Sequence, residues 1–528
     1  MIMRKGDVSF KRESVDTSAR GILRLHTTRH PLLYEVNTRI LLNELSRKAG
    51  KRITLATIPE EVIDEWASLG FDAIWLMGVW TTGKVGLKIA REFAGLHDEY
   101  RRALPDFEPG DVIGSPYAVK SYSVSRSLGG NKAMLTLRRK LEKRGLGLIL
   151  DFVCNHTARD HPWVSRFPEF YINGTPGDEV GHPDLYFRAT TTRGERTIAY
   201  GRDPTFPGWT DTAQLNHMHG GLRRRLIELL EKISEMCDGV RCDMAMLTLR
   251  GVFERTWGER AKPEDGQCAE GEFWKEAIDA TKEKHPGFLF VAESYWDLEW
   301  QLQQVGFDYT YDKRLYDRLL REGASSVYDH LCAEAPYQQK SLRFLENHDE
   351  PRAAQSLSSP TWHCAAVAIT GTVAGMVLFH DGQLEGRTVK IPVQLGRRPL
   401  ENPSPLIQGF YKRLLECLNT PVFRQGTWQL LSAKPAWHDN STWRNFLAFW
   451  WNGGVHGRRF IVVNYAPHNA QCLIQLPLED ADSGTLEFRD LMGPSVYYRE
   501  RPVLVTKGMF FDLPPYFVHL FDVKQAHV

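Results

Sequence analysis

Eight short apolar runs, separated by helical patterns or long loops, constrain the fold of this 528-residue chain more than any other feature. Apolar runs that alternate with helices are typical of a parallel sheet covered by helices. Eight such units favour a closed (β/α)₈ TIM barrel, an α/β fold, over an open sheet. The runs occupy residues 32–40, 72–80, 146–153, 239–244, 288–294, 307–312, 342–347 and 375–381.

Helical signals lie between these runs. In the segment 131–144, Met134, Leu137 and Leu141 fall on one helical face, and the segment 222–236 has the same kind of pattern. Thr57 and Glu60 have the spacing of a capping box ahead of another apolar face. These patterns predict the helices that cover the barrel.

The composition changes at two places along the chain. Residues 155–219 are rich in Pro, Gly, Asp, Thr and His with little periodicity, which predicts a long functional loop after the third strand. Beyond about residue 425, short strand-like runs alternate with turns and no helix is expected. We therefore predict a polar N-terminal extension (1–30), a catalytic barrel (31–154 and 220–425), an inserted loop subdomain (155–219) and a C-terminal antiparallel β-sandwich (426–528).

The charge balance excludes two classes of partner. Lys and Arg number 66 and Asp and Glu number 65, so there is no electrostatic case for nucleic acid or an anionic membrane. The start of the chain has no apolar signal-like region, and no stretch of 18 apolar residues occurs. The eight cysteines contain no CxxC pair, which favours reduced, buried thiols. We expect a cytoplasmic location.

Polar residues stand at the ends of four predicted strands, where an apolar core would not tolerate them without a reason. The carboxyl ends of barrel strands meet at one mouth, so these side chains are expected to converge there. They comprise three carboxylates, Asp243, Glu293 and Asp349, together with Arg241, His156 and His348.

Neighbouring carboxylates repel, so one tends to stay ionised while another keeps its proton near neutral pH. A glycosidase needs this division between a nucleophile and an acid. Arg241 lies two residues before Asp243 and therefore on the same face of the strand, where it would hold Asp243 ionised. The alternative is that Asp243 is a structural carboxylate paired with Arg241. For a retaining site, the carboxyls of Asp243 and Glu293 should lie roughly 5–5.5 Å apart.

Four motifs carry a family resemblance. DFVCNH, GVRCD, VAES and ENHD, at the third, fourth, fifth and seventh strands, resemble in order the signature regions of the α-amylase family, glycoside hydrolase family 13. The resemblance implies Asp243 as nucleophile, Glu293 as general acid/base and Asp349 as transition-state stabiliser. It also implies sugar-binding roles, which fall to Arg241, His156, His348 and Tyr117.

The sequence departs from the family pattern at two places. Met246 and Leu247 replace the Lys-His pair that many amylases have after the nucleophile. The fifth region reads Ala213-Gln214-Leu215 where the family usually has Pro-Asp-Leu. The missing carboxylate and His belong to the calcium site of typical amylases, and Asn155 alone is a poor calcium site. We expect no metal and no cofactor.

The residues and the resemblance together predict a retaining α-glycoside hydrolase. Its expected substrates are maltooligosaccharides or related α-glucans. One alternative is a transglycosidase or isomerase acting on a small α-glucoside such as maltose, sucrose or trehalose, because the same carboxylates serve water and sugar acceptors. Another is a catalytically silent family member that binds sugar. The sequence leaves linkage, substrate length and oligomeric state open.

Overall fold

A closed, parallel barrel forms the centre of the computed structural model, which describes residues 28–478 and 484–526. Most of the predicted N-terminal extension lies outside the described residues. Each of the eight apolar runs contains one barrel strand, so the (β/α)₈ prediction is confirmed. In spatial order the strands are β1 (Leu32–Asn37), β15 (Met376–His380), β14 (Ser341–Phe344), β13 (Tyr309–Tyr311), β12 (Leu289–Ala292), β11 (Gly239–Cys242), β5 (Gly147–Phe152) and β2 (Ala73–Met77).

The barrel strands are buried on both faces, as parallel strands covered by helices must be. In β2, Trp75 and Met77 pack inside the barrel with residues of the other strands. Ile74 and Leu76, which alternate with them, face the surrounding helices. The barrel interior is thus a packed core and not an open channel.

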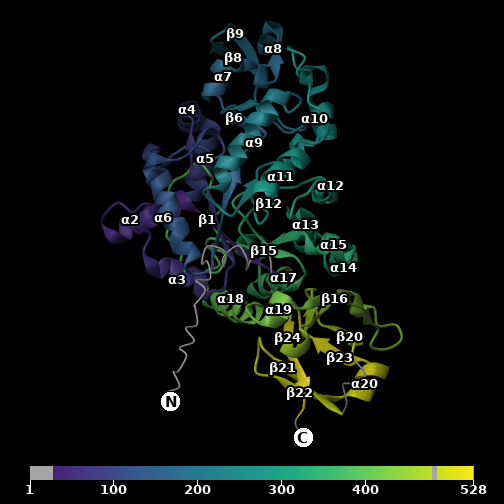
Figure 1. Cartoon of the computed structure of the whole chain (residues 1–528). Coiled ribbons are helices and arrows are strands. Elements are labelled where there is room, and N and C mark those ends of the chain that lie inside the picture. Colours follow the sequence, from purple (N-terminus) through teal and green to yellow (C-terminus); the bar gives the residue numbers. More distant parts are fainter. Residues whose placement is uncertain (1–27, 479–483, 527–528) are drawn as a thin grey trace, which may run out of the picture.

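Helices surround the barrel (Figure 1). Helix α3 begins at Glu60 with Pro59 as its N-cap, so the prediction of a capping box at Thr57 was wrong. Instead, the Thr57 hydroxyl accepts the N–H of Thr54 within the preceding 3₁₀ turn. The helices of the barrel and its loops are α2 (Thr38–Ala49), α3 (Glu60–Ser68), α4 (Lys84–Glu92), α5 (Ala94–Ala103), α6 (Gly130–Glu142), α9 (Gly220–Ser234), α10 (Arg250–Trp257), α11 (Phe273–Lys284), α12 (Glu299–Gln304), α13 (Lys313–Arg321), α14 (Ala324–Leu331), α15 (Ala335–Gln339), α16 (Ala353–Ser356), α17 (Pro360–Thr372), α18 (Pro405–Leu418) and α19 (Pro421–Gln425).

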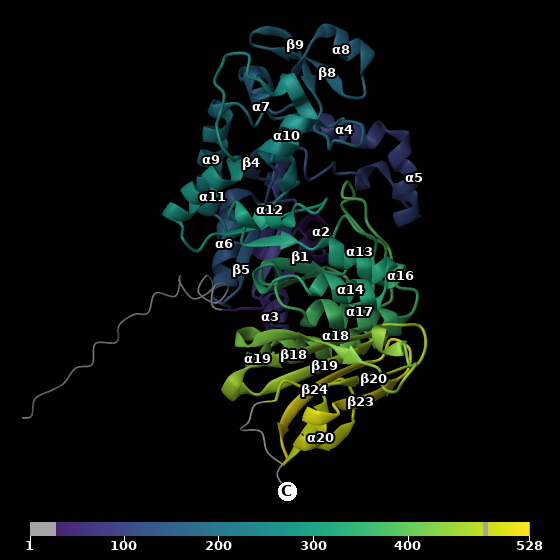
Figure 2. The same cartoon turned by 90° about the vertical axis from the view of Figure 1, so that its right-hand side faces the viewer.

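The segment 155–219 follows β5 and is more ordered than the expected loop. It contains a three-stranded sheet in the order β7-β9-β8 and the antiparallel pair β10-β6. Figures 1 and 2 place it at the end of the molecule opposite the C-terminal strands. Its elements are β6 (His156–Ala158), α7 (Pro162–Arg166), β7 (Asn173–Gly174), α8 (Pro176–Gly181), β8 (Tyr186–Thr191), β9 (Gly194–Ala199) and β10 (Thr212–Gln214); a separate two-stranded antiparallel sheet pairs β3 (Trp80–Thr82) with β4 (Val119–Val124).

Two antiparallel sheets at the C-terminal end enclose one apolar cluster, as a β-sandwich requires. Phe460 and Trp450 of the larger sheet meet Phe511 and Ile474 of the smaller one in this cluster. One helix, α20 (Arg501–Thr506), interrupts the strands, so the expectation of no helix here was wrong. The strands are β16 (Thr427–Leu431), β17 (Ala433–Lys434), β18 (Phe446–Asn452), β19 (Arg458–Asn464), β20 (Ala470–Ile474), β21 (Thr485–Asp490), β22 (Val496–Glu500), β23 (Met509–Leu513) and β24 (Val518–Gln525).

No helix in the described part of the chain has both the length and the apolar character that crossing a bilayer demands.

Candidate active site

Three carboxylates meet at the mouth of the barrel. Asp243 and Glu293 immediately follow β11 and β12, and Asp349 follows β14 by five residues. All three line one cavity of about 340 Å³, together with Tyr117 and His156. The structure therefore brings together the carboxylates that the sequence placed at separate strand ends.

The barrel ladder fixes the backbone of two of these carboxylates. The N–H of Asp243 donates to the carbonyl of Phe152 at 3.0 Å, and the N–H of Glu293 donates to the carbonyl of Cys242 at 3.0 Å. Each residue thus extends the parallel hydrogen-bonding pattern just past its strand. A site built on such a rigid edge holds its side chains more precisely than one built on a free loop.

One buried guanidinium contacts both carboxylates. The Nη1 of Arg241 lies 2.7 Å from Oδ1 of Asp243, and its Nη2 lies 2.7 Å from Oε1 of Glu293. Nε of Arg241 donates to the hydroxyl of Tyr311 at 3.3 Å. Arg241 is fully buried, so its charge acts on both carboxylates with little screening by water.

Glu293 is held by donors from three directions. The Tyr295 hydroxyl donates to its Oε1 at 3.0 Å, and the N–H of Met244 donates to its Oε2 at 2.6 Å. Met244 has a φ of 45°, a left-handed conformation that is uncommon for a residue with a side chain. This turn after Asp243 aims a backbone donor at the neighbouring carboxylate.

The three carboxylates differ in pKa because their surroundings differ. Burial raises the pKa of Glu293 to about 7, although Arg241 opposes the shift. Burial also raises the pKa of Asp243, against the pull of its ion pair with Arg241. Partial burial works against ionisation of Asp349, but the charge of His348 holds its pKa well below the usual range. Near neutral pH, Glu293 is the carboxylate that retains a proton.

His348 is held between two acids. Its Nδ1 lies 2.5 Å from Oε1 of Glu35, and its Nε2 lies 2.8 Å from Oδ2 of Asp349. Burial would lower the pKa of His348, but these two carboxylates raise it to about 10. His348 is therefore a cation that binds Asp349, while the Asp349 side chain remains 45% exposed toward the cavity.

Tyr117 and His156, the other sugar-binding candidates, line the same cavity. The Tyr117 ring stacks on His348 with 5.4 Å between ring centroids, and the Arg241 guanidinium lies 5.4 Å from the Tyr117 ring centre. His156 lies in β6 and contacts Trp209 edge to face at 5.1 Å. Burial lowers the pKa of His156 to about 4, so it is a neutral hydrogen-bonding group.

Sequence reasoning missed several residues of this site. Glu35 lies inside the apolar run of β1, and a single acid in such a run was its only signal. Tyr295, Trp209 and Asp211 line the cavity from loops without any recognised motif.

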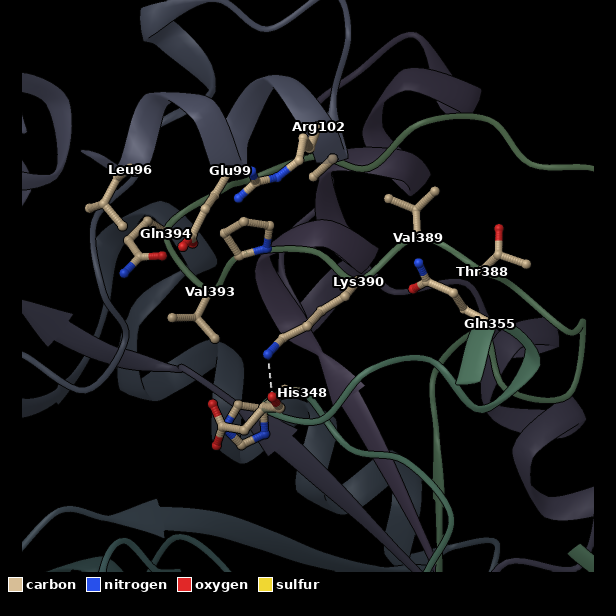
Figure 3. Close-up of a pocket in the computed structure, with 13 residues that line it drawn as sticks. Leu96, Glu99, Arg102, His348, Gln355, Thr388, Val389, Lys390, Val393 and Gln394 are labelled. Carbon is tan, nitrogen blue, oxygen red and sulfur yellow. Dashed lines mark hydrogen bonds and ion pairs between the residues drawn. The ribbon is translucent and has the colours of Figure 1, made fainter. Parts of the chain in front are cut away.

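A second cavity of about 690 Å³ adjoins the first and shares Asp349 and Gln394 with it. Leu96, Glu99 and Arg102 of α5 line this second cavity together with the segment from Thr388 to Gln394, as Figure 3 shows. Lys390 donates to the backbone carbonyl of Asp349 across this space. The site is therefore an open cleft rather than a closed chamber.

The residues in the place of the amylase calcium site do not fit calcium. Nε2 of Gln214 donates to three carbonyl oxygens, at 2.9 Å to Asn155 O, 3.0 Å to Asn155 Oδ1 and 3.0 Å to Leu215 O. An amide nitrogen thus occupies the centre to which these oxygens point. Calcium requires six to eight oxygen ligands with carboxylates among them, and the described residues contain no cluster of three or more His, Cys, Asp or Glu suited to a metal.

A (β/α)₈ barrel with carboxylates and a buried arginine at its mouth defines a glycosidase-type enzyme. Residues 60–388 match the family model described as the catalytic domain of alpha amylase. The chain therefore belongs to the α-amylase family of glycoside hydrolases, and the resemblance of its motifs is confirmed.

Among curated proteins, the chain is 23% identical over 364 residues to the alpha-amylase MalA of Haloarcula japonica, covering 67% of this chain and 44% of that protein. It is 23% identical over 325 residues to an alpha-1,4-glucan:maltose-1-phosphate maltosyltransferase of Rhodospirillum rubrum, covering 60% of this chain and 40% of that protein. The chain thus spans less than half the length of these two relatives. Among solved structures, the noncanonic maltogenic alpha-amylase AmyB of Thermotoga neapolitana has the same fold, with a TM-score of 0.63, 18% identity, and coverage of 95% of this chain and 100% of that one.

Proposed function

We propose that this protein hydrolyses α-glucosidic bonds of maltooligosaccharides or related α-glucans with retention of anomeric configuration. The observation that carries the proposal is the contact of one buried guanidinium with both Asp243 and Glu293, 2.7 Å from each. This contact makes the two carboxyls neighbours at one cavity. Their expected separation is the roughly 5–5.5 Å of a double-displacement site.

In the first step, the carboxylate of Asp243 attacks the anomeric carbon and forms a covalent glycosyl-enzyme. Glu293, whose pKa of about 7 keeps it largely protonated in mildly acidic water, gives its proton to the departing glycosidic oxygen. The C–O bond of the glycoside breaks as the C–O bond to Asp243 forms. The aglycone leaves as a neutral alcohol.

In the second step, the Glu293 carboxylate takes a proton from water as the water oxygen attacks the anomeric carbon. The bond to Asp243 breaks, the sugar leaves with its original configuration, and Glu293 regains its proton. Asp349, kept ionised by His348, accepts hydrogen bonds from hydroxyls of the reacting sugar. His156 and Tyr117 line the pocket around that sugar, while the buried Arg241 and His348 bind the carboxylates of Asp243 and Asp349.

A transfer reaction is the second candidate, on a small glucoside such as maltose, sucrose or trehalose. Met246 and Leu247, which replace the Lys-His pair, are almost completely buried, so they present no polar group to an acceptor. Contacts from other loops would then decide whether a sugar acceptor or water attacks the glycosyl-enzyme. The maltosyltransferase activity named for one relative shows that such transfer occurs on a related chain. A silent sugar-binding protein is the third candidate.

We also propose that the protein works in the reducing environment of the cytoplasm. All eight cysteines are free thiols in the structure, and six of them are buried. Reduced cysteines in this number are typical of intracellular proteins. The expected partner is a neutral oligosaccharide or α-glucan, recognised by hydrogen bonds and aromatic contacts.

The test uses a panel of maltooligosaccharides, isomaltose, sucrose and trehalose, with products and anomers followed by NMR. Shorter products that appear first as α-anomers support retaining hydrolysis. New, longer sugars support transfer instead. Loss of turnover in Asp243→Asn assigns the nucleophile, and azide added to Asp243→Ala should yield a β-glycosyl azide by single displacement. Unchanged turnover in Asp243→Asn would overturn the catalytic proposal.

A further inference from the structure

Gln214 closes the strand pair that carries part of the cavity wall. It is the last residue of β10, is fully buried and pairs with His156 of β6. His156, Trp209 and Thr212 all line the catalytic cavity. The amide of Gln214 thus lies directly behind residues expected to contact substrate.

The orientation of this amide follows from its neighbours. Nε2 faces the backbone carbonyls of Asn155 and Leu215, which only accept, and Oε1 of Gln214 accepts from Nδ2 of Asn155 at 3.3 Å. A flipped amide would set oxygen against three oxygens. The site is therefore a converging set of carbonyl oxygens with a hydrogen-bond donor at its centre.

The amide links two stretches of chain that are 59 residues apart in the sequence. Asn155 is the first residue of the inserted segment, just after the barrel strand β5, and Gln214 ends β10 near the other end of that segment. The N–H of Leu215 adds a bond of 3.1 Å to the carbonyl of Asn155. Asn155 Nδ2 also lies 3.4 Å from Nδ1 of His156, so the network reaches the candidate sugar-binding imidazole.

We propose that Gln214 is a positioning residue: its neutral amide, in place of a bridging cation, joins the two ends of the inserted segment at the barrel mouth and fixes His156 without any metal. This inference rests on the proposed function only for its activity readout. It has a specific chemical consequence. A carboxylate at position 214 would face three carbonyl oxygens with no proton to donate, and a hard divalent cation would relieve that repulsion.

The experiment compares the wild type with Gln214→Glu and Gln214→Asp, in EGTA and in millimolar calcium chloride. Thermal unfolding is the first readout, because it needs no substrate. We expect the Tm of the wild type to change by less than about 1 °C on adding calcium, and that of at least one carboxylate variant to rise by about 3 °C or more. The kcat/KM on a maltooligosaccharide should recover with calcium in the same variant, in parallel with its Tm.

Two further variants separate positioning from general packing. Gln214→Ala removes the donor without creating a ligand, so its loss of stability should not respond to calcium. Gln303→Glu is the matched control, because Gln303 is equally buried but its Nε2 faces one hydroxyl, of Thr310, and one carbonyl, of Tyr337. Calcium should not restore this variant.

Three outcomes would overturn the proposal. The first is that calcium stabilises the wild type as much as the carboxylate variants, or that EGTA inactivates the wild type. The second is that the Tm of neither Gln214→Glu nor Gln214→Asp changes with calcium. The third is that calcium restores Gln303→Glu equally well. Each result leaves the proposed hydrolysis standing, because wild-type turnover is measured separately.

Discussion

Nδ1 of His348 lies 2.5 Å from Oε1 of Glu35, a contact that joins the loop after β14 to strand β1, two strands away in the barrel. Glu35 is fully buried, so its charge acts on the imidazole with little competition from water. The same imidazole binds Asp349 through Nε2. A residue in the barrel interior thereby sets the charge of a group at the mouth.

Replacing this acid should loosen the hold on Asp349. Glu35→Gln removes one of the two negative charges that raise the pKa of His348, so that pKa should fall from about 10. At a pH above its lowered pKa, His348 becomes neutral and no longer binds Asp349 as a cation. We expect kcat/KM to drop by about 10- to 100-fold, with the loss growing as pH rises. NMR titration of the His348 ring tests the first step, and an unchanged His348 pKa would refute the link.

Glu293 predicts the alkaline limit of activity. The acid form is needed for the first step, and burial places its pKa at about 7. Activity should therefore fall as pH rises through about 7, when Glu293 loses its proton. The pH dependence of kcat/KM measures this limb directly. An alkaline limb that survives unchanged in Glu293→Gln would assign it to another group.

Tyr295 offers a way to move that limb. Its hydroxyl donates to Oε1 of Glu293 at 3.0 Å, which favours the ionised form. Tyr295→Phe should raise the pKa of Glu293 and shift the alkaline limb to higher pH, with a modest loss of kcat. Tyr122→Phe is a suitable control, because the Tyr122 hydroxyl bonds to the backbone of Val153 instead. A limb that moves equally in both variants would show a general effect of packing.

The sequence was sufficient to predict the barrel because the hydrophobic runs and the helical spacing act locally. It also predicted the convergence of Asp243, Glu293 and Asp349, because the mouth of a parallel barrel collects all strand ends. Glu35 escaped prediction because its role depends on which strands become neighbours across a closed barrel. Only the folded arrangement places it against His348.

The inserted segment was harder to predict for a different reason. Its strands are short and its order comes from contacts between distant residues, such as the pairing of Gln214 with His156. Such pairing leaves little periodicity in the sequence. The domain limits at residues 155, 219 and 425 and the catalytic roles remain predictions, although the elements themselves are in place.

Glu346 predicts how stability depends on pH. It lies just after β14 and before His348, and its Oε1 lies 2.6 Å from Nη1 of Arg352 and 3.2 Å from Nδ1 of His380. Burial disfavours the charged carboxylate, but the charge of Arg352 and the hydrogen bond with His380 lower the pKa of Glu346 to about 2. An acid whose pKa is lower in the folded state than in the unfolded state stabilises the protein at pH values above its unfolded-state pKa. The contribution, about 3 kcal/mol, is lost as pH falls from about 4.5 to about 2.

Glu346→Gln isolates this contribution. The variant should be less stable than the wild type at pH 7, and the difference should shrink as pH falls toward about 3, because the unfolded wild type then binds a proton that the folded state does not. Urea unfolding at a series of pH values gives the free energy of unfolding for each protein. Glu179→Gln provides a control, since Glu179 pairs with an exposed Arg188 and should contribute little at any pH. A constant difference between Glu346→Gln and the wild type from pH 7 to pH 3 would show that the loss comes from packing and not from charge.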